Sequence, residues 1–257
     1  MCELFGLSAS EKVNINDELK EFYSHAPKNP DGWGLSLHDD RVSFFYKEEK
    51  RADKSTYLSG VLSGRVRAKD AIAHIRLATV GYEDMNNTHP FTAYDLSGRE
   101  WIFAHNGTIF ESDPLNPYVY VQKGDTDSER ILLYIIDCMN ARIKKNRRPL
   151  DEDQRFKVLE KIIAEISPKN KLNLLIYDGE ILYVHTNFKD SLYEREEDGA
   201  LYFSTKPLSA GTWENVPFTR LLSYRGGELL REGTDHGNEY IPDESSVNAI
   251  YLAYSGL

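Results

Sequence analysis

Two strong helical patterns, placed between two runs of short strands, constrain the fold of this 257-residue chain most. Apolar residues repeat at helical spacing over residues 128–145 and again over residues 152–166, where they form one continuous stripe. Short apolar segments bounded by turn residues come before and after this pair of helices. A run of strands, two helices and more strands predicts an α+β fold of packed layers, with antiparallel strand pairing.

Shorter patterns predict the remaining elements. A helix is expected at residues 16–26, with Asn14 or Asn16 as its cap, and another at residues 53–63. Asp39-Asp40 and Asp178-Gly179 are expected to join strands in hairpins, the second because Asp-Gly suits a type I′ turn. Further strands are expected at residues 2–9, 33–38, 41–47, 71–77, 100–105, 171–177, 181–186, 200–204 and 221–224. Since the chain has no repeat or long linker, we expect one domain over residues 1–257.

Composition argues against several classes of function. The formal net charge of -10 disfavours a surface for nucleic acid or for an anionic membrane, and the basic residues at 142–148 indicate a solvated helix end. We expect a soluble, cytoplasmic protein, because the sequence has neither a membrane-length apolar run nor a signal-peptide pattern. Two distant cysteines and seven scattered histidines predict no disulfide and no metal site. We expect no cofactor, because no glycine-rich phosphate loop occurs.

Cys2, directly behind Met1, is the most informative single position for function. Removal of Met1 would leave a thiol and a free α-amine on one residue, with reference pKa values of about 8.5 and about 7.7–8.0. A free amine beside a nucleophile can accept its proton and later return it, as the histidine of a catalytic triad does. The alternative is that Cys2 is a small apolar residue opening a buried strand, as Cys138 is expected to be an inert core thiol.

Four further residues supply groups that a nucleophilic cysteine needs. Asn106 and Gly107 follow a strand in an expected turn, where N–H groups can stabilise an oxyanion, although Asn-Gly is also a common turn. Arg76 ends an apolar strand, where a guanidinium binds a carboxylate ligand or forms an internal ion pair. Asp127 precedes a helix, and either Asp127 or Asp125 is expected to cap it. The aspartate that is not the cap is then free to bind an ammonium group. Together these groups describe a pocket for a γ-glutamyl group.

The motifs around these residues resemble those of the class II glutamine amidotransferases, which are N-terminal-nucleophile hydrolases. The closest similarity is to the stand-alone kind that lacks a fused synthase domain. Six segments match in the family's order: Met1-Cys2-Glu3-Leu4-Phe5-Gly6, Asp31-Gly32-Trp33-Gly34, residues 73–81, Asn87-Thr88-His89-Pro90-Phe91, Ala104-His105-Asn106-Gly107 and residues 124–129. The second half matches more loosely, at residues 173–179 and 205–208.

The resemblance implies a four-layer αββα sandwich and a role for each candidate residue. Cys2 corresponds to the nucleophile, with its α-amine as the general base. Asn106 and Gly107 match the oxyanion hole. Arg76 matches the residue that binds the substrate α-carboxylate, and Asp127 matches the residue that binds the α-amino group.

Three further positions bear on the pocket. His89 falls on a histidine near the pocket, where we expect structural support rather than catalysis. Many family members have Trp and, three residues on, His after the arginine, whereas this chain has Leu77 and Val80. An apolar Val80 removes a polar contact, so the substrate can be glutamine or another γ-glutamyl compound.

We therefore expect hydrolysis of a γ-glutamyl amide through a thioester on Cys2, with a small-molecule substrate and no nucleic acid or membrane partner. One alternative is a glutaminase subunit that passes ammonia to a separate synthase, or that works with a peptidase partner. Another is a catalytically silent binding protein on the same fold. A bile-salt or penicillin amidase also uses an N-terminal cysteine, but it does not need a clamp made by Arg76 and Asp127.

Overall fold

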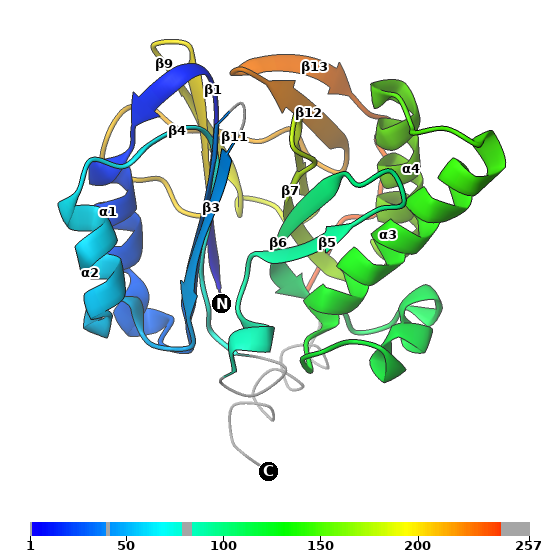
Figure 1. The fold of residues 1–257 in the computed structure, drawn as a ribbon, viewed down its shortest axis with the longest axis horizontal. Helices are drawn as coiled ribbons and strands as arrows, with labels where there is room; N and C mark the ends of the chain where they lie inside the picture. The colour runs from blue at the N-terminus through cyan, green and yellow to red at the C-terminus, as the bar shows by residue number, and fades with distance from the viewer. Residues whose placement is uncertain (1, 40–41, 79–83, 243–257) are drawn as a thin grey trace.

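Two antiparallel sheets packed face to face form the centre of the computed structural model, which describes residues 2–39, 42–78 and 84–242 (Figure 1). The first sheet has the strand order β11-β9-β10-β1-β4-β2-β3, and the second has the order β13-β12-β8-β7-β6-β5. The strands are β1 (Glu3–Asn14), β2 (Trp33–Asp39), β3 (Val42–Glu48), β4 (Arg67–Ile75), β5 (Phe91–Tyr94), β6 (Glu100–Thr108), β7 (Lys171–Tyr177), β8 (Leu182–Thr186), β9 (Tyr193–Glu197), β10 (Ala200–Ser204), β11 (Glu214–Asn215), β12 (Leu221–Arg225) and β13 (Glu228–Glu232).

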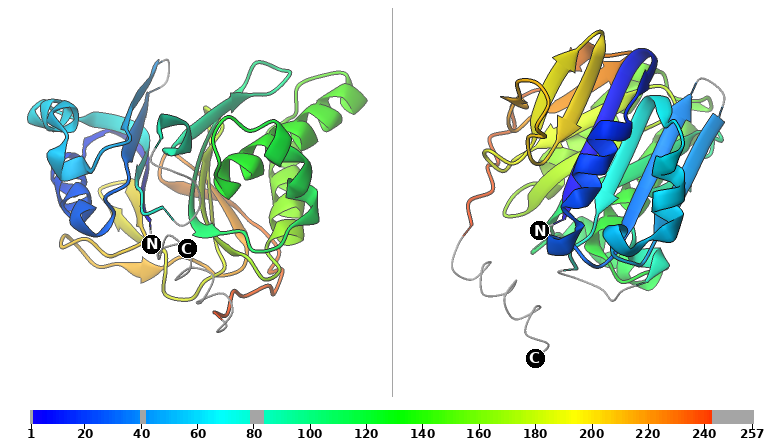
Figure 2. Two further views of the ribbon diagram at one scale, coloured as in Figure 1. Left: turned by 90° about the horizontal axis from the view of Figure 1, so that it is seen from below. Right: turned by 90° about the vertical axis from the view of Figure 1, so that its left-hand side faces the viewer.

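Helices cover the outer face of each sheet, as Figures 1 and 2 show. Helices α1 (Asn16–Ser24) and α2 (Thr56–Ser63) pack on the first sheet, and α3 (Asp127–Asn146) and α4 (Glu152–Ile166) pack on the second. Three apolar clusters fill the spaces between these layers, and the central one lies between the two sheets. The order helix, sheet, sheet, helix confirms the α+β fold and the αββα sandwich expected from the sequence.

Strand alternation decides which side chains of β6 face each layer. Trp101 and Phe103 face the helices α3 and α4, whereas Ile102 and Ala104 face the other sheet. The same alternation continues to the end of β6, so Asn106 belongs to the inner face. This register determines which groups reach the candidate site.

The N-cap expected for the first helix was wrong, because contacts distant in sequence decide the role of Asn16, and the helix expected over residues 53–63 was only partly right. Ile15 stands at the N-cap of α1, while the side chain of Asn16 donates to the carbonyls of Leu62 and Gly64 at 3.0 and 2.8 Å. The helix expected over residues 53–63 is a 3₁₀ turn at Ala52–Lys54, followed by α2. Asn16 therefore fastens α1 to the end of α2 instead of capping its own helix.

Both expected hairpins are present, but the second turn lies one residue later than expected. In the first, Asp39 belongs to β2 instead of the turn, and its pairing with Val42 confirms the hairpin; residues 40 and 41 lie outside the described residues. In the second, Tyr177 pairs with Leu182, and the turn centres on Gly179, with a φ of 88°, and the residue after it. Asp178 is instead fully buried, where it accepts from Arg155 Nε at 2.7 Å.

None of the helices within residues 2–39, 42–78 and 84–242 combines the length and the apolar character needed to cross a membrane.

Candidate active site

Segments distant in sequence meet at one end of the sandwich and surround a small cavity. Strand register brings two of them together, because Glu3 of β1 pairs with Ile75 of β4 and so places Cys2 beside the segment that starts at Arg76. Cys2, Arg76, Gly107 and Asp127 all line the cavity. Its other lining residues are Leu77, Ala78, His89, His105, Thr126 and Ser128.

The cavity has a volume of about 20 Å³. That space is enough for about one water molecule. A larger ligand therefore requires the surrounding segments or side chains to move apart.

The thiol of Cys2 is held by the backbone of the segment that follows β4. Its Sγ atom lies 3.2 Å from the carbonyl oxygen of Leu77 and accepts from the N–H of the same residue, also at 3.2 Å. Burial raises the pKa of the Cys2 thiol, and the negative charge of Asp127 acts in the same direction, while the Leu77 N–H and the positive charge of Arg76 oppose them. The thiol is therefore protonated near neutral pH, and a base must remove its proton before it can attack.

Asn106 and Gly107 lie within β6, not in the expected turn. They pair with Asn173 and Leu172 of β7, and this ladder overrides the turn preference of Asn-Gly. The side-chain amide nitrogen of Asn106 donates to the main-chain carbonyl of Cys2, and its side-chain oxygen accepts from Asn173 at 3.0 Å. Asn106 thus contacts Cys2 directly, although it is not one of the residues that line the cavity.

Gly107 occupies a position that no larger residue fits. A Cβ atom there would lie 1.8 Å from the carbonyl oxygen of Lys171 and 2.3 Å from Nε2 of His105. Glycine is therefore required by the close approach of β7 and of a neighbouring ring.

Arg76 is 2% exposed and follows β4 directly. Its backbone N–H donates to Gly32 at 2.8 Å, its carbonyl accepts from the N–H of Asp31 at 3.0 Å, and its Nη1 atom lies 3.5 Å from the carbonyl of Asp31. The carboxylate of Asp31 accepts from the N–H of Ala78 at 2.7 Å. The Asp31-Gly32 motif thus anchors the segment that carries Arg76 and touches the thiol.

Asp127 is the first residue of α3, and the expectation that it or Asp125 caps the helix was wrong. Thr126 is the cap, because its hydroxyl accepts from the N–H of Glu129 at 3.2 Å. The buried carboxylate of Asp127 accepts from the N–H groups of Ile109 and Ser128, at 2.7 and 2.9 Å. Because the hydroxyl of Thr126 caps the helix, the carboxylate of Asp127 is not needed for that role. Two backbone N–H groups hold this carboxylate at the cavity.

His105 is a cavity residue to which the sequence analysis assigns no role, although it lies at the end of an expected strand. Strand alternation would have found it, since it faces α3 while Asn106 faces the other sheet. Its ring lies between Ser128 Oγ and the carbonyl of Lys171, at 2.9 Å from each. Burial lowers the pKa of His105, and the negative charge of Asp127 opposes this effect.

His89 lines the cavity from the segment before β5. Its ring centre lies 4.2 Å from that of His74 and 4.5 Å from that of Phe91. Burial lowers the pKa of His89 well below its usual value, so its ring is neutral. Packing of a neutral ring agrees with the supporting role expected of His89, which stays a prediction. Val80, the other position discussed near the pocket, lies outside the described residues.

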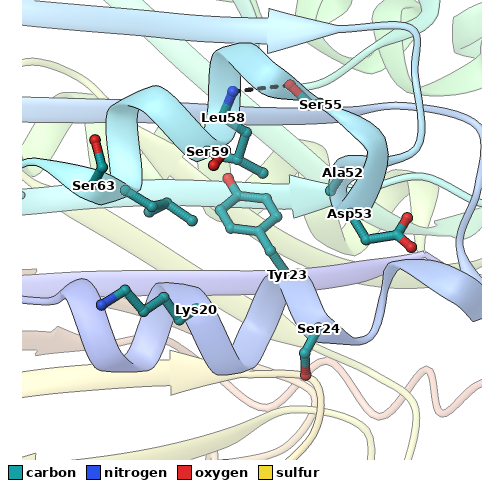
Figure 3. Close-up of a pocket in the computed structure, with 10 residues that line it drawn as sticks. Lys20, Tyr23, Ser24, Ala52, Asp53, Ser55, Leu58, Ser59 and Ser63 are labelled. Atoms are coloured by element: carbon teal, nitrogen blue, oxygen red, sulfur yellow. Dashed lines mark hydrogen bonds between the residues drawn. The ribbon is translucent and has the colours of Figure 1, made fainter.

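A larger hollow lies elsewhere on the molecule, between α1 and α2, with a volume of about 450 Å³ (Figure 3). Lys20, Tyr23, Ser59 and Ser63 line it, and Ser55 caps α2 beside it by accepting from the N–H of Leu58 at 2.9 Å. At the smaller cavity the thiol of Cys2 meets a buried guanidinium, that of Arg76, and a buried carboxylate, that of Asp127, so we take that cavity as the candidate active site. Within the described part of the chain, no group of three or more His, Cys, Asp and Glu side chains could hold a metal ion.

Comparison with known proteins gives one family. Residues 1–197 match the family model described as class II glutamine amidotransferases. YafJ of Escherichia coli strain K12, provisionally named as a glutamine amidotransferase, is 29% identical over 192 residues, which cover 73% of this chain and 74% of YafJ. The uncharacterized protein MJ1515 of Methanocaldococcus jannaschii is 27% identical over 260 residues, which cover 90% of this chain and 71% of that protein.

A solved structure with a similar fold is the glutamine phosphoribosylpyrophosphate amidotransferase of B. subtilis, complexed with ADP and GMP. The TM-score is 0.64 at 19% sequence identity, over 90% of this chain and 48% of that one. At this identity the likeness concerns the fold alone. It confirms that the αββα sandwich is of the N-terminal-nucleophile hydrolase type.

Proposed function

The chain belongs to the class II glutamine amidotransferases, and from this premise we propose that it hydrolyses the γ-amide of glutamine or of another γ-glutamyl compound through a thioester on Cys2. The single observation that supports this proposal is the shared cavity. A thiol, a buried guanidinium and a buried carboxylate meet there, and Gly107 completes its wall. A zwitterionic amino-acid head needs both charges, and its side-chain amide needs the sulfur.

The proposed reaction requires that Met1 has been removed, so that the nitrogen of Cys2 is an amine. This amine accepts the thiol proton, and sulfur attacks the γ-carbonyl carbon to form a tetrahedral intermediate. The side-chain amide of Asn106 and the N–H of Gly107 stabilise its oxyanion. The protonated α-amine then returns its proton to the leaving nitrogen, and the C–N bond breaks to give ammonia or an amine and the thioester.

Deacylation follows the same path in reverse with water as the nucleophile. The α-amine takes a proton from water as oxygen attacks the thioester carbonyl, and it returns the proton to sulfur as the C–S bond breaks. Glutamate leaves and the free thiol is restored. In this proposal Arg76 binds the α-carboxylate of the substrate, and Asp127 binds its α-ammonium group.

The cavity volume of about 20 Å³ sets a condition for this proposal. A γ-glutamyl group is much larger than one water molecule, so binding must open the site. Leu77 and Ala78 belong to the cavity wall. Two hydrogen bonds connect Leu77 to the Cys2 thiol, and one connects the N–H of Ala78 to the carboxylate of Asp31. Displacement of this segment is the opening that we propose.

A second candidate is a glutaminase subunit that passes ammonia to a separate synthase or works with a peptidase. The observation that favours it is the match to the B. subtilis amidotransferase, which covers 48% of that chain. That enzyme therefore has a long part with no counterpart in the compared residues. Co-purification of a partner that raises glutamate release would support this candidate over independent hydrolysis.

Cys2→Ala is the direct test of the proposal, with Cys138→Ala as the matched control. Glutamate release is measured on glutamine, γ-glutamyl dipeptides and glutathione, and intact mass establishes whether Met1 is gone. We expect no turnover for Cys2→Ala and full turnover for Cys138→Ala, because the second thiol lies on α3, outside the cavity. Wild-type activity in Cys2→Ala would rule out the thioester, and inactivity of the processed wild type on the whole panel would favour a silent binding protein.

A further inference from the structure

A groove runs between helices α3 and α4, in the layer that covers the second sheet (Figure 1). The two helices are antiparallel, because the hydroxyl of Tyr134 donates to the carboxylate of Glu165 at 2.8 Å, and the side chain of Asn146 donates to that of Gln154 at 3.3 Å. The groove has a volume of about 610 Å³, and none of its lining residues lines the candidate active site. It is therefore a separate feature of the molecule, with no role in the proposed reaction.

The floor of the groove consists of small and apolar side chains. Cys138 and Val158 are partly buried and pack against the apolar core beneath them. Ile162 is buried, and Ala141 is exposed. Small side chains in a groove between helices let another element approach closely. The floor thus provides an apolar surface that a further element can cover.

Basic side chains lie along both sides of this floor. The α3 side has Arg142 and Lys145, three residues apart, and the α4 side has Lys157 and Lys161, four residues apart. Residues at these spacings share one face of a helix, so each pair lies on the groove side of its helix. All four residues are exposed. The groove is therefore rich in cations, although the chain has a formal net charge of -10.

The two acidic residues that line the groove are already bound within the protein. The carboxylate of Asp153 lies 2.6 Å from Nζ of Lys157 and 3.0 Å from Nη1 of Arg231. The carboxylate of Glu165 accepts from the hydroxyl of Tyr134. Asp153 thus pairs with one of the four groove cations and leaves the other three.

Those three cations, Arg142, Lys145 and Lys161, have no carboxylate oxygen within 4.0 Å among the residues that the structure describes. Exposed ammonium and guanidinium groups are well hydrated, so the fold does not require a partner for them. They are therefore available to the negative groups of another molecule.

The shape of the groove favours a helix as its occupant. From Tyr134 to Lys145 the axis of α3 rises about 16 Å, which is about three turns. The backbone groups of α3 and α4 are bonded within each helix, so the groove offers no backbone partners to an extended peptide. An amphipathic helix bonds its own backbone and can place an apolar stripe in such a groove. Carboxylates on both sides of that stripe would then lie beside the cations on both sides of the floor.

We propose that this groove binds an acidic amphipathic helix of a partner protein, about three turns long, with its apolar stripe on the floor and its carboxylates beside the cations. Charge complementarity selects this partner. Two copies of this chain facing each other through the groove would bring like charges together. A nucleic acid is disfavoured, because the net charge of -10 repels a polyanion. The proposal does not depend on the function proposed for Cys2.

Cys138 makes occupation of the groove measurable, because its thiol lies in the floor. The chain has two cysteines, so in Cys2→Ala the floor thiol is the one that reacts. Labelling by a fluorescent maleimide is followed with and without a synthetic peptide of about 18 residues, long enough to form a helix. Its leucines recur at helical spacing, glutamates flank them, and alanines fill the far side. We expect the saturating peptide to slow labelling about tenfold, and less as the salt concentration rises.

Two control peptides test the chemistry of the partner. One has lysine in place of every glutamate, and the other has the acidic composition in an order without the leucine stripe. Both should leave the labelling rate unchanged. Equal slowing by either control, or no slowing by the acidic peptide, would overturn the proposal. Slowing by an RNA oligonucleotide but not by the acidic peptide would also overturn it, in favour of a nucleic-acid site.

Lys145→Glu and Lys144→Glu, each added to Cys2→Ala, form a matched pair of variants. Both lysines are exposed and lie in the last turn of α3, but only Lys145 lines the groove. Lys145→Glu should raise the peptide concentration needed for half-maximal protection about fivefold, and Lys144→Glu less than about twofold. Equal labelling rates without peptide show that both variants are folded alike. An equal loss of protection in the two variants would contradict binding in the groove.

Other occupants give different results in the same assay. If a second copy filled the groove, labelling without peptide would slow as the protein concentration rises. If the chain's own residues 243–257 filled it, their removal would speed labelling. Either result would overturn the proposal. Glutamate release is not measured, so failure of this proposal and failure of the proposed function remain distinguishable.

Discussion

The side-chain amide of Asn106 donates a hydrogen bond to the main-chain carbonyl of Cys2. This contact joins β6 of the second sheet to the start of β1 in the first, at the edge of the cavity. The position of the proposed nucleophile relative to the expected oxyanion donor is therefore set by a direct hydrogen bond. Asn173 fixes the other end of the same side chain, at 3.0 Å.

Asn106→Ala should reduce kcat by about 10²–10³, because it removes one oxyanion donor. It also leaves the Cys2 carbonyl and the Asn173 amide without this partner, so we expect a loss of about 1–3 kcal/mol in unfolding free energy. Glutamate release and urea unfolding measure the two effects. Asn116→Ala, at an exposed position, is the control and should change neither. A kcat within about tenfold of wild type would exclude Asn106 from the oxyanion site.

Asp127→Asn should raise KM for glutamine by about 10–100-fold, since a charge-assisted hydrogen bond contributes about 1.5–3 kcal/mol. A substrate analogue without the α-amino group, such as glutaramate, should lose nothing further in this variant. Steady-state kinetics on both compounds separates recognition of the ammonium from a general defect. Asp125→Asn is the matched control, because that side chain is exposed. Equal losses on both compounds would contradict the assignment of Asp127 to the ammonium.

The layers of the fold could be predicted because the patterns that specify them are local. The stripe of α4 and the alternation in β7 occur within single segments, and both elements have the expected bounds, Glu152–Ile166 and Lys171–Tyr177. What failed depended on partners distant in sequence. The side chain of Asn16 binds the end of α2 instead of capping its own helix. Asn106 and Gly107 are extended because they pair with β7, instead of forming a turn.

The candidate site could be predicted as a list of residues, but not as an arrangement. Cys2, Arg76, Gly107 and Asp127 line one cavity, and motif order was enough to select them. The small volume of that cavity could not be predicted, because it depends on side-chain packing between segments. The burial of Lys171 at the start of β7 could not be predicted for a similar reason, because lysine is usually exposed and its burial depends on the pairing of β7 within the sheet.

Stability should decrease as the pH falls below about 6.5, because several histidines are buried in the neutral form, among them His38, His74 and His185. Burial lowers the pKa of His74 and of His185 to about 3, and that of His38 to about 4. Between these values and about 6.5 the unfolded chain binds protons that the folded chain does not. Each histidine then removes about 1 kcal/mol of unfolding free energy per pH unit.

Urea unfolding near pH 7 and near pH 5 measures this dependence on pH. His38→Phe keeps a ring beside Tyr177, whose centre lies 4.5 Å from that of His38, and removes the titrating group. Its pH dependence should therefore be smaller than that of the wild type by about one proton. Equal stability of the wild type at the two pH values would show that these histidines are protonated in the folded protein.

Gly107→Ala and Gly60→Ala should change stability in opposite directions. At Gly107 a Cβ atom would lie 1.8 Å from the backbone oxygen of Lys171, and backbone cannot yield as a flexible side chain can. We expect β6 and β7 to separate locally, with a loss of about 2 kcal/mol or more in unfolding free energy and with loss of turnover. At Gly60, within α2, the new Cβ atom has nothing within 4 Å, so alanine should stabilise the helix by about 0.5–1 kcal/mol and leave turnover unchanged. Chemical unfolding and glutamate release on both variants make the comparison. A Gly107→Ala protein as stable and active as Gly60→Ala would show that β7 does not approach Gly107 of β6 closely enough to exclude a side chain.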